Sequence, residues 1–266
     1  MKKDTEQGIR LNKYLSHNTK YSRREADDLI KAGHVKIRGK VVTDLATRVQ
    51  KGDKVFLKGR FVHPKTEFTV IVYHKRKGEL VTKKDDRGRK TIYDQLPKRY
   101  HHFIPVGRLD YASEGLVLLT DSPDVATALM RSPLERVYYL KIRGEVTEGM
   151  TNAMREGLFV ENATKGAHPK SEITSMEFAP FLWYKIQKSS GGYTKLKVAI
   201  NEGKNRELRR FFAYFDAEVV DLKRVEFGGI SLDTLPPGKV RFLSKSEYHS
   251  LHTFLDGLKK EKRGEL

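Results

Sequence analysis

Cysteine is absent from this chain of 266 residues. Without it the protein has no disulfide, no metal centre held by thiolates and no cysteine nucleophile, which suits a reducing compartment. Apolar runs are short as well, since none approaches the roughly 18 residues of a membrane-spanning helix. Residues 1–7 also lack the apolar core of an export signal. We therefore expect a cytoplasmic protein that is not inserted in a membrane.

The motifs of common cofactor and metal sites are missing too. The chain has no Gly-x-Gly-x-x-Gly after a predicted strand, no P-loop, no His-Glu-x-x-His and no Gly-x-Ser-x-Gly. A bound nucleotide cofactor, a zinc centre and a serine hydrolase site are therefore unsupported. We expect neither a cofactor nor a metal.

Acidic residues are scarce relative to basic ones. The 52 Lys and Arg against 34 Asp and Glu leave a net charge of +18 and a pI near 9.8. Such a surplus favours polyanionic partners, with nucleic acid first among them, although a merely basic surface would give the same composition. Residues 1–65 carry +10 of this charge. The N-terminal quarter is therefore the predicted polyanion-binding region.

Two short helices and a small sheet are predicted at the N-terminus. Leu11, Tyr14 and Leu15 have helical spacing, and Ser22-Arg-Arg-Glu25 is a capping box that opens a second helix. A glycine at position 33 is typical of a helix end, and alternating apolar residues follow it. The strands expected here are 34–38, 41–42 and 55–57.

The stretch RLNKYLSHNTKYSRREADDLIKAGHVKIRGKVV, which begins at residue 10, resembles the S4 RNA-binding domain. We assign this domain to residues 9–62. Aromatic residues are few here, so recognition of folded RNA by phosphate and shape is favoured over base stacking. A solvated basic helical hairpin without a ligand is the alternative. The cations expected to contact RNA are Arg23, Arg24, Lys31, Lys36 and Arg38.

The periodicity lapses at residues 61–66, and a second domain is predicted over residues 67–258. Its pattern indicates an α+β fold with a mixed, largely antiparallel sheet flanked by helices. A basic stretch at 74–90 is weakly periodic, and we expect a loop or ribbon over a binding face. The expected strands are 68–73, 116–120, 137–142, 194–200, 218–225 and 240–243, and the expected helices are 123–130, 147–155, 205–214 and 244–258.

The most distinctive segment is Gly107-Arg108-Leu109-Asp110-Tyr-Ala-Ser-Glu-Gly-Leu-Val-Leu-Leu-Thr120. A charged turn leads directly into an apolar run suited to a buried strand, which would hold the turn rigidly at a sheet edge or cleft. Taken alone, Asp110 could equally be a turn residue or a helix cap.

This segment resembles the motif GRLD-x-x-[ST]-x-GLLLLT of the bacterial ribosomal RNA pseudouridine synthases that carry an N-terminal S4 domain. The likeness covers nearly all of residues 9–250. Three further segments resemble motifs of the same family, in the same order along the chain. Arg136–Gly144 resembles the family pattern K-x-Y-L-V, and Asn201–Phe211 resembles EG-[RK]-N-R-Q-[VL]-RR-[MF]. Val220–Leu243 resembles the closing pattern V-x-L-x-R followed by L-x-x-L-x-x-G-x-x-R-x-L. The chain departs from the family at residues 73–78 and 120–123, where N-K-P-x-G and T-N-D-G are usual.

The resemblance implies roles for individual side chains. Asp110 would be the nucleophile, Tyr138 the aromatic beside the target uracil, and Arg209 the basic partner of Asp110. Arg108 would fill the gap left by a flipped base. Adjacent helix residues project about 100° apart, so only one of Arg209 and its neighbour should reach Asp110. In the same motif, the cations expected to contact RNA are Lys204 and Arg206.

The expected activity is therefore isomerisation of a uridine in ribosomal RNA, in the large subunit rather than the small one. The substrate would be a folded stem-loop or a pre-ribosomal particle, bound by a monomer. One alternative is a non-catalytic S4-type ribosome assembly factor, which an intact Asp110 disfavours. Another is a different S4-bearing enzyme, a tRNA synthetase or RNA methyltransferase, which the missing glycine-rich nucleotide loop disfavours.

Overall fold

The structure is a computed structural model that describes residues 8–65 and 67–263. These residues form two compact units. The first holds the chain up to Thr69 together with Lys98–Ile104 and Thr120–Thr127. The second holds Val70–Pro97, Pro105–Leu119 and the chain from Ala128 onward.

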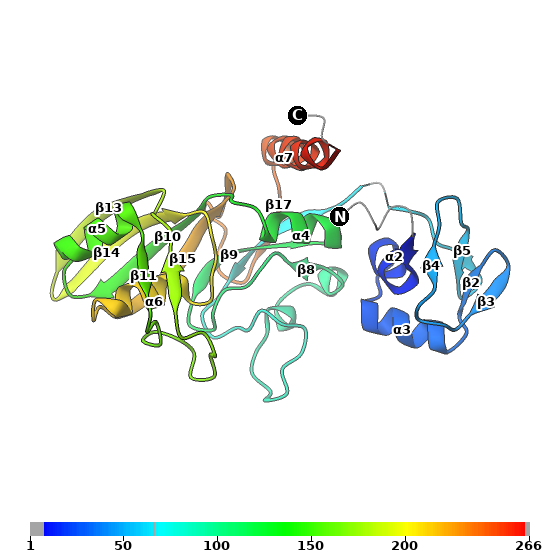
Figure 1. The fold of residues 1–266 in the computed structure, drawn as a ribbon, viewed down its shortest axis with the longest axis horizontal. Helices are drawn as coiled ribbons and strands as arrows, with labels where there is room; N and C mark the ends of the chain where they lie inside the picture. The colour runs from blue at the N-terminus through cyan, green and yellow to red at the C-terminus, as the bar shows by residue number, and fades with distance from the viewer. Residues whose placement is uncertain (1–7, 66, 264–266) are drawn as a thin grey trace. The chain divides into compact units, whose positions relative to one another are not determined.

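Two helices and two small sheets build the N-terminal part of the first unit (Figure 1). The helices are α2 (Leu11–Asn18) and α3 (Arg23–Lys31). The strand order of the larger sheet is β3-β2-β5-β6, formed by Lys40–Val42, Val35–Ile37, Val55–Leu57 and Arg60–Phe61. The second sheet pairs β1 (Ile9–Arg10) with β4 (Arg48–Val49). The helices bury Leu11, Leu15, Ala26 and Ile30 against Val35, Val49 and Val55.

Local chemistry explains where the second of these helices begins and ends. The Ser22 hydroxyl accepts a hydrogen bond from the Glu25 N–H, and the Glu25 carboxylate accepts one from the Ser22 N–H. Gly33 follows the helix with φ of 72°, a conformation that costs glycine little. The predicted capping box and helix end are confirmed. Strands β1, β4 and β6 were not predicted, because two residues are too few to show alternation.

A nine-stranded mixed sheet dominates the described part of the second unit. Its main order is β13-β14-β10-β15-β9-β7-β17, with β16 paired to β15 and β8 to β9. Strands β15 and β9 run parallel, whereas β10 runs antiparallel to both β14 and β15. In sheet order the main strands are Trp183–Ser190, Tyr193–Ile200, Arg136–Arg143, Val219–Phe227, Glu114–Thr120, Val70–Lys75 and Val240–Phe242, and the two additional strands are Ile230–Ser231 and Ile104–Pro105.

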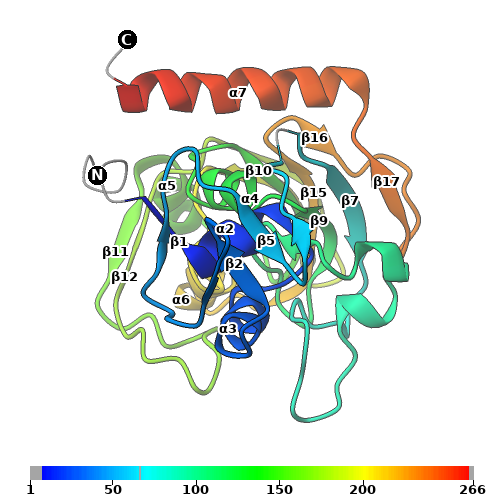
Figure 2. The same ribbon diagram turned by 90° about the vertical axis from the view of Figure 1, so that its right-hand side faces the viewer.

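Helices flank this sheet, and Figure 2 shows α7 (Lys245–Arg263) on one side and α6 (Glu207–Tyr214) on the other. The Tyr248 hydroxyl of α7 bonds to the backbone of Val70 in β7. Two further α-helices are α5 (Glu148–Glu156), in this unit, and α4 (Pro123–Met130), whose first five residues belong to the first unit. The α+β class and the positions of all four helices in the predicted catalytic region are confirmed.

One prediction for this region was wrong in part, and several strands were not predicted. The segment 74–90 was expected to be a loop or ribbon over a binding face, but its first two residues, His74 and Lys75, are buried and belong to β7. Strand β13 (Trp183–Ser190) was missed because it lies at the sheet edge with mostly exposed side chains and no regular apolar alternation. The Gly191-Gly192 turn that joins it to β14 was the available signal. The short pair β11 (Leu158–Val160) and β12 (Met176–Phe178) was also missed.

Candidate active site

A short turn ahead of β9 carries Asp110. The Asp110 carbonyl accepts a hydrogen bond from the Ser113 N–H at 3.0 Å, which closes the turn. Two residues further on, Gly115 has φ of 116°, and a Cβ there would lie 2.1 Å from the Arg224 carbonyl oxygen. Only glycine allows this close approach of β9 to β15. The turn is therefore anchored on the middle of the sheet.

Lys75 fixes the same turn from the end of β7. Its side chain is fully buried, and Nζ donates hydrogen bonds to the carbonyl oxygens of Ser113 at 2.7 Å and Tyr111 at 3.5 Å. Burial lowers the pKa of Lys75 to about 8, although the nearby Glu79 and Asp110 carboxylates oppose that shift. The lysine thus holds two carbonyl groups of the turn itself. Lys75 was expected to lie in a loop or ribbon, and its residue pattern did not indicate this contact.

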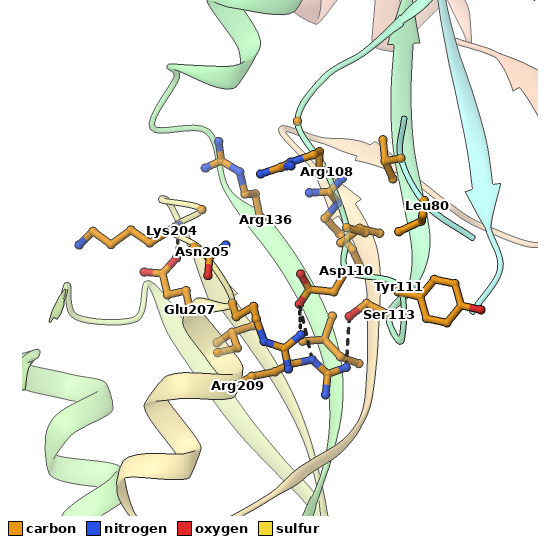
Figure 3. A pocket seen from close by; sticks show the side chains of 18 of the residues that line it. Leu80, Arg108, Asp110, Tyr111, Ser113, Arg136, Lys204, Asn205, Glu207 and Arg209 are labelled. Carbon is orange, nitrogen blue, oxygen red and sulfur yellow. Dashed lines mark hydrogen bonds and ion pairs between the residues drawn. The ribbon is translucent and has the colours of Figure 1, made fainter. Parts of the chain in front are cut away.

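Two arginines at the start of α6 meet the Asp110 carboxylate (Figure 3). Arg206 Nη1 lies 3.4 Å from Asp110 Oδ2, and Arg209 Nε lies 3.6 Å from the same oxygen. Arg209 is held in place by hydrogen bonds from Nη1 to the Val219 carbonyl at 2.8 Å and from Nη2 to the Ser113 hydroxyl at 3.2 Å. Burial and the neighbouring Arg206 lower the pKa of Arg209. The predicted pairing of Asp110 with Arg209 is present in the structure.

The next arginine of α6 has a different environment. Arg210 is buried, and its guanidinium donates to the carbonyl oxygens of Ala163 and Ile173 and to the Ser171 hydroxyl. Of the two adjacent arginines only Arg209 reaches Asp110, as the rotation of about 100° per helix residue requires. Arg210 instead ties the 163–173 segment to the helix.

Arg206 was expected to contact RNA, but it lies against Asp110. It occupies the position before the first residue of α6 with φ of 51°, the left-handed region. Its Nε donates to the Gly166 carbonyl at 2.7 Å, which orients the rest of the guanidinium. A left-handed non-glycine residue cannot be read from sequence spacing, so this second ion pair of Asp110 was missed.

A cavity of about 810 Å³ surrounds Asp110, within the second unit. Tyr138 of β10 lines it with only 6% of its surface exposed, and Arg108 lines it from an exposed position. The adjacent Tyr139 points to the opposite face of the sheet and is 39% exposed, as strand alternation predicts. The cavity therefore combines an acid, fixed cations and a tyrosine ring.

The carboxyl groups of Glu202 and Glu207 support the loop that precedes α6, part of which lines the cavity. Glu207 is buried, and its Oε2 accepts a hydrogen bond from the Lys204 N–H at 2.9 Å. Burial, together with its hydrogen bond to Glu202, raises the pKa of Glu207 to about 8. Lys204, expected to contact RNA, is exposed, and its amine binds Glu202 at 2.9 Å. Glu207 and Glu202 therefore share a hydrogen bond beneath this loop, with the proton held more tightly than on a free carboxyl group.

The five cations expected to bind RNA in the first unit are all exposed: Arg23, Arg24, Lys31, Lys36 and Arg38. They project from α3, β2 and the turn after β2. Arg38 is engaged by Asp53 at 2.6 Å, which the sequence did not indicate. The remaining four are the stronger candidates for phosphate contacts.

Among residues 8–65 and 67–263, no group of three or more His, Asp or Glu side chains is placed to hold a metal ion. No helix within these same residues is long and apolar enough to cross a membrane.

A basic N-terminal unit indicates a polyanionic partner such as RNA, and a carboxylate held beside two arginines in a cavity is a candidate catalytic site. Together they indicate the class of enzymes that act on polyanions. Comparison with known proteins narrows this class. Residues 69–214 match the family model of the RNA pseudouridylate synthases, and residues 9–55 match the S4 domain. The chain belongs to the RNA pseudouridylate synthase family and is an isomerase that converts uridine in RNA to pseudouridine.

Two relatives and one solved structure support this assignment. An uncharacterised RNA pseudouridine synthase from Helicobacter pylori (strain ATCC 700392 / 26695) is 55% identical over 93% of this chain and 95% of its own length. The ribosomal large subunit pseudouridine synthase B of Bacillus subtilis (strain 168) is 32% identical over 93% of this chain and 97% of its own. A crystal structure of a pseudouridylate synthase matches with a TM-score of 0.59 at 25% identity, over 92% of this chain and all of that one.

Proposed function

We propose that this enzyme modifies one specific uridine of the large ribosomal subunit RNA, with Asp110 as its nucleophile. The observation that carries the proposal is the position of Asp110, in the cavity that Tyr138 lines and beside the two arginines of α6. The choice of RNA is supported by the Bacillus subtilis relative, which is named for the large subunit.

The target base must leave its helix before it can react. Extrusion costs a few kcal/mol and is repaid by contacts in a closely fitting pocket. A cavity of about 810 Å³ is large enough for a nucleotide. Arg108 lies exposed at that cavity, where its guanidinium can fill the space that the flipped base leaves in the RNA.

The reaction exchanges one bond for another. The bond from uracil N1 to the ribose C1′ breaks, the base rotates, and a bond from C5 to C1′ forms while C5 loses its proton and N1 gains one. The Asp110 carboxylate attacks the sugar or base, or helps to form a glycal, and so divides this exchange into easier steps. Substrate and product are isomers, so the reaction needs no oxidant or external energy.

The surrounding side chains position the reacting groups. Arg209 holds and orients the carboxylate through a guanidinium that two further hydrogen bonds fix, and the Arg206 guanidinium lies on the same oxygen. Such preorganised charge needs little rearrangement during reaction. The ring of Tyr138 forms an apolar wall that keeps the detached uracil in place while it rotates.

We further propose that the S4 domain spans residues 9–62 and anchors a folded stem-loop or a pre-ribosomal particle. Its exposed Arg23, Arg24, Lys31 and Lys36 would contact phosphates, as would Lys204 near the cavity. The catalytic domain would span residues 67–258 of a monomeric protein that works in the cytoplasm, where its RNA substrate would be.

The experiment is to map pseudouridines in ribosomal RNA from cells with and without the gene. One site in the large subunit RNA should change from pseudouridine to uridine and be restored by the wild-type gene. Loss of a site in the small subunit RNA instead would contradict the proposed target. An unchanged map together with an assembly defect would favour the non-catalytic assembly factor.

A further inference from the structure

The face of the large sheet opposite the catalytic cavity carries an array of cations and aromatic rings. We define the outer face by Tyr139 and Lys141 of β10, Tyr193, Lys195 and Lys197 of β14, and Trp183 of β13. Strand alternation places all six on one side, while Tyr138, Leu196 and Val198 point to the other. None of the six lines the catalytic cavity.

The strand register brings these side chains together. Tyr139 lies directly opposite Lys197, and Lys141 lies opposite Lys195. Trp183 pairs with Ala199, two positions along β14 from Lys197. Directly paired residues on one face have Cβ atoms about 5 Å apart. The outer face is therefore continuous across three strands.

Rings and cations alternate across this surface, and two carboxylates lie among them. The Trp183 indole N–H donates a hydrogen bond to Glu135, and Glu226 lies near Lys197. Lys197 Nζ lies 5.5 Å from the ring centre of Tyr139 and 5.5 Å from that of Trp183. Lys141 Nζ lies 4.3 Å from the ring centre of Tyr193. Tyr139 and Trp183 each keep 39% of their surface exposed. Lys195 is exposed beside them.

We propose that the outer face binds an unpaired segment of RNA. Open rings on a sheet stack bases, and interleaved lysines neutralise the phosphates between them, which is the chemistry by which single strands are held without strict sequence preference. The positive charge opposes a second copy of this basic chain as the occupant. The segment bound here is distinct from the uridine in the cavity and gives the enzyme a second hold on a long substrate.

Trp183 makes the proposal directly measurable, because it is the only tryptophan in the chain. The probe is a twelve-nucleotide oligoadenylate, which contains no uridine and so cannot be a substrate. Titrating it into the full-length protein should quench Trp183 emission to a plateau, with an apparent affinity that falls as salt is added. No quenching at low salt would overturn the proposal.

Variants locate the binding on this surface. Lys185 is an exposed neighbour, opposite Lys197. Lys185→Ser with Lys195→Ser should weaken the affinity about fivefold or more, because two phosphate contacts are lost. The matched control is Lys245→Ser with Lys260→Ser, two exposed lysines of α7, which should have no effect. Equal weakening by both pairs of substitutions would show that the affinity depends only on the net charge of the protein, and it would overturn the proposal.

Ring stacking is tested with a labelled oligoadenylate and anisotropy. Trp183→Phe should bind nearly as the wild type does, whereas Trp183→Ala should bind about tenfold more weakly. Circular dichroism should show both variants folded. Full affinity of Trp183→Ala for the oligoadenylate would contradict the proposal. A second contradicting result would be a wild-type dimer, seen by sedimentation without RNA, that Trp183→Ala abolishes, because the outer face would then bind a second copy of the chain. Isomerisation of a short stem-loop, which depends on Asp110, should be unchanged in all these variants.

Discussion

The arginines of the S4 helix and those of α6 have the same guanidinium but very different surroundings. Arg23 and Arg24 are exposed on the first turn of α3. Arg209 is largely buried, hydrogen-bonded at both terminal nitrogens and paired with a carboxylate. An exposed cation attracts RNA through its charge, and salt screens that attraction. A cation fixed by hydrogen bonds instead holds a reacting group in the correct position. The comparison predicts that the first set governs RNA affinity and the second governs the rate of reaction.

The largest effect among the supporting residues is expected at Arg209. Arg209→Lys keeps the charge but cannot hold Val219, Ser113 and Asp110 together. We expect kcat to fall about a hundredfold with little change in KM, since the lost contacts act on the carboxylate that we propose as the nucleophile. Single-turnover kinetics on a ribosomal RNA fragment would measure this.

The adjacent Arg210 is the matched control for that variant. Arg210→Lys disrupts buried contacts to the 163–173 segment but none to Asp110. It should lower Tm more than Arg209→Lys does and reduce kcat less. The opposite pattern would mean that Arg209 acts only through stability.

The tyrosine of the cavity should show the next largest effect. Tyr138→Leu removes the ring beside the proposed uracil position. We expect kcat/KM to fall about tenfold or more, because stacking of a base on an aromatic ring typically contributes that much binding free energy. Tyr138→Phe keeps the ring and should lose less. An equal loss in both variants would point to the hydroxyl rather than the ring.

In the S4 domain the expected change is in binding. Arg23→Ser with Lys36→Ser should weaken RNA binding about tenfold and reduce the slope of log K against log salt by about 2, one for each phosphate contact. The rate at saturating enzyme should not change. Lys51→Ser, at an exposed lysine elsewhere in the same unit, is the control. An unchanged slope would contradict the assignment of this surface.

The smallest effect concerns Glu207, whose pKa is raised from 4.5 to about 8 by burial and by Glu202. A group with a raised pKa in the folded protein binds its proton more tightly there than in the unfolded chain. Its contribution to stability is therefore complete below about pH 4.5 and is lost as the pH rises towards 8. Glu207→Gln should flatten this part of the Tm profile, measured by calorimetry. A profile that keeps its slope would show that Glu207 is ionised.

Much of this fold could be predicted because its signals are local. The capping box at Ser22 and the apolar run after Asp110 each specify an element within a few residues. The pairing of Asp110 with Arg209 could be predicted only from the resemblance to a family, because 98 residues of chain separate them and composition gives no distance.

The features that the sequence did not reveal depend on long-range contacts or on backbone conformations that residue spacing does not encode. Lys75 lies in the polar run His-Lys-Arg-Lys-Gly, which is typical of a loop, yet carbonyl oxygens of the distant Asp110 turn satisfy its buried amine. Arg206 reaches Asp110 only because of its left-handed backbone. The outer face depends on β13, an edge strand without regular apolar alternation.

The most direct measurement of the central claim is single-turnover conversion of a large-subunit RNA fragment by the wild type and by Asp110→Asn. Both proteins are used at saturating concentration, with RNA affinity determined separately. The account predicts equal affinity and a rate at least about a thousandfold lower for the variant, because the nucleophile is gone while shape is kept. Turnover of Asp110→Asn within tenfold of the wild-type rate would contradict it.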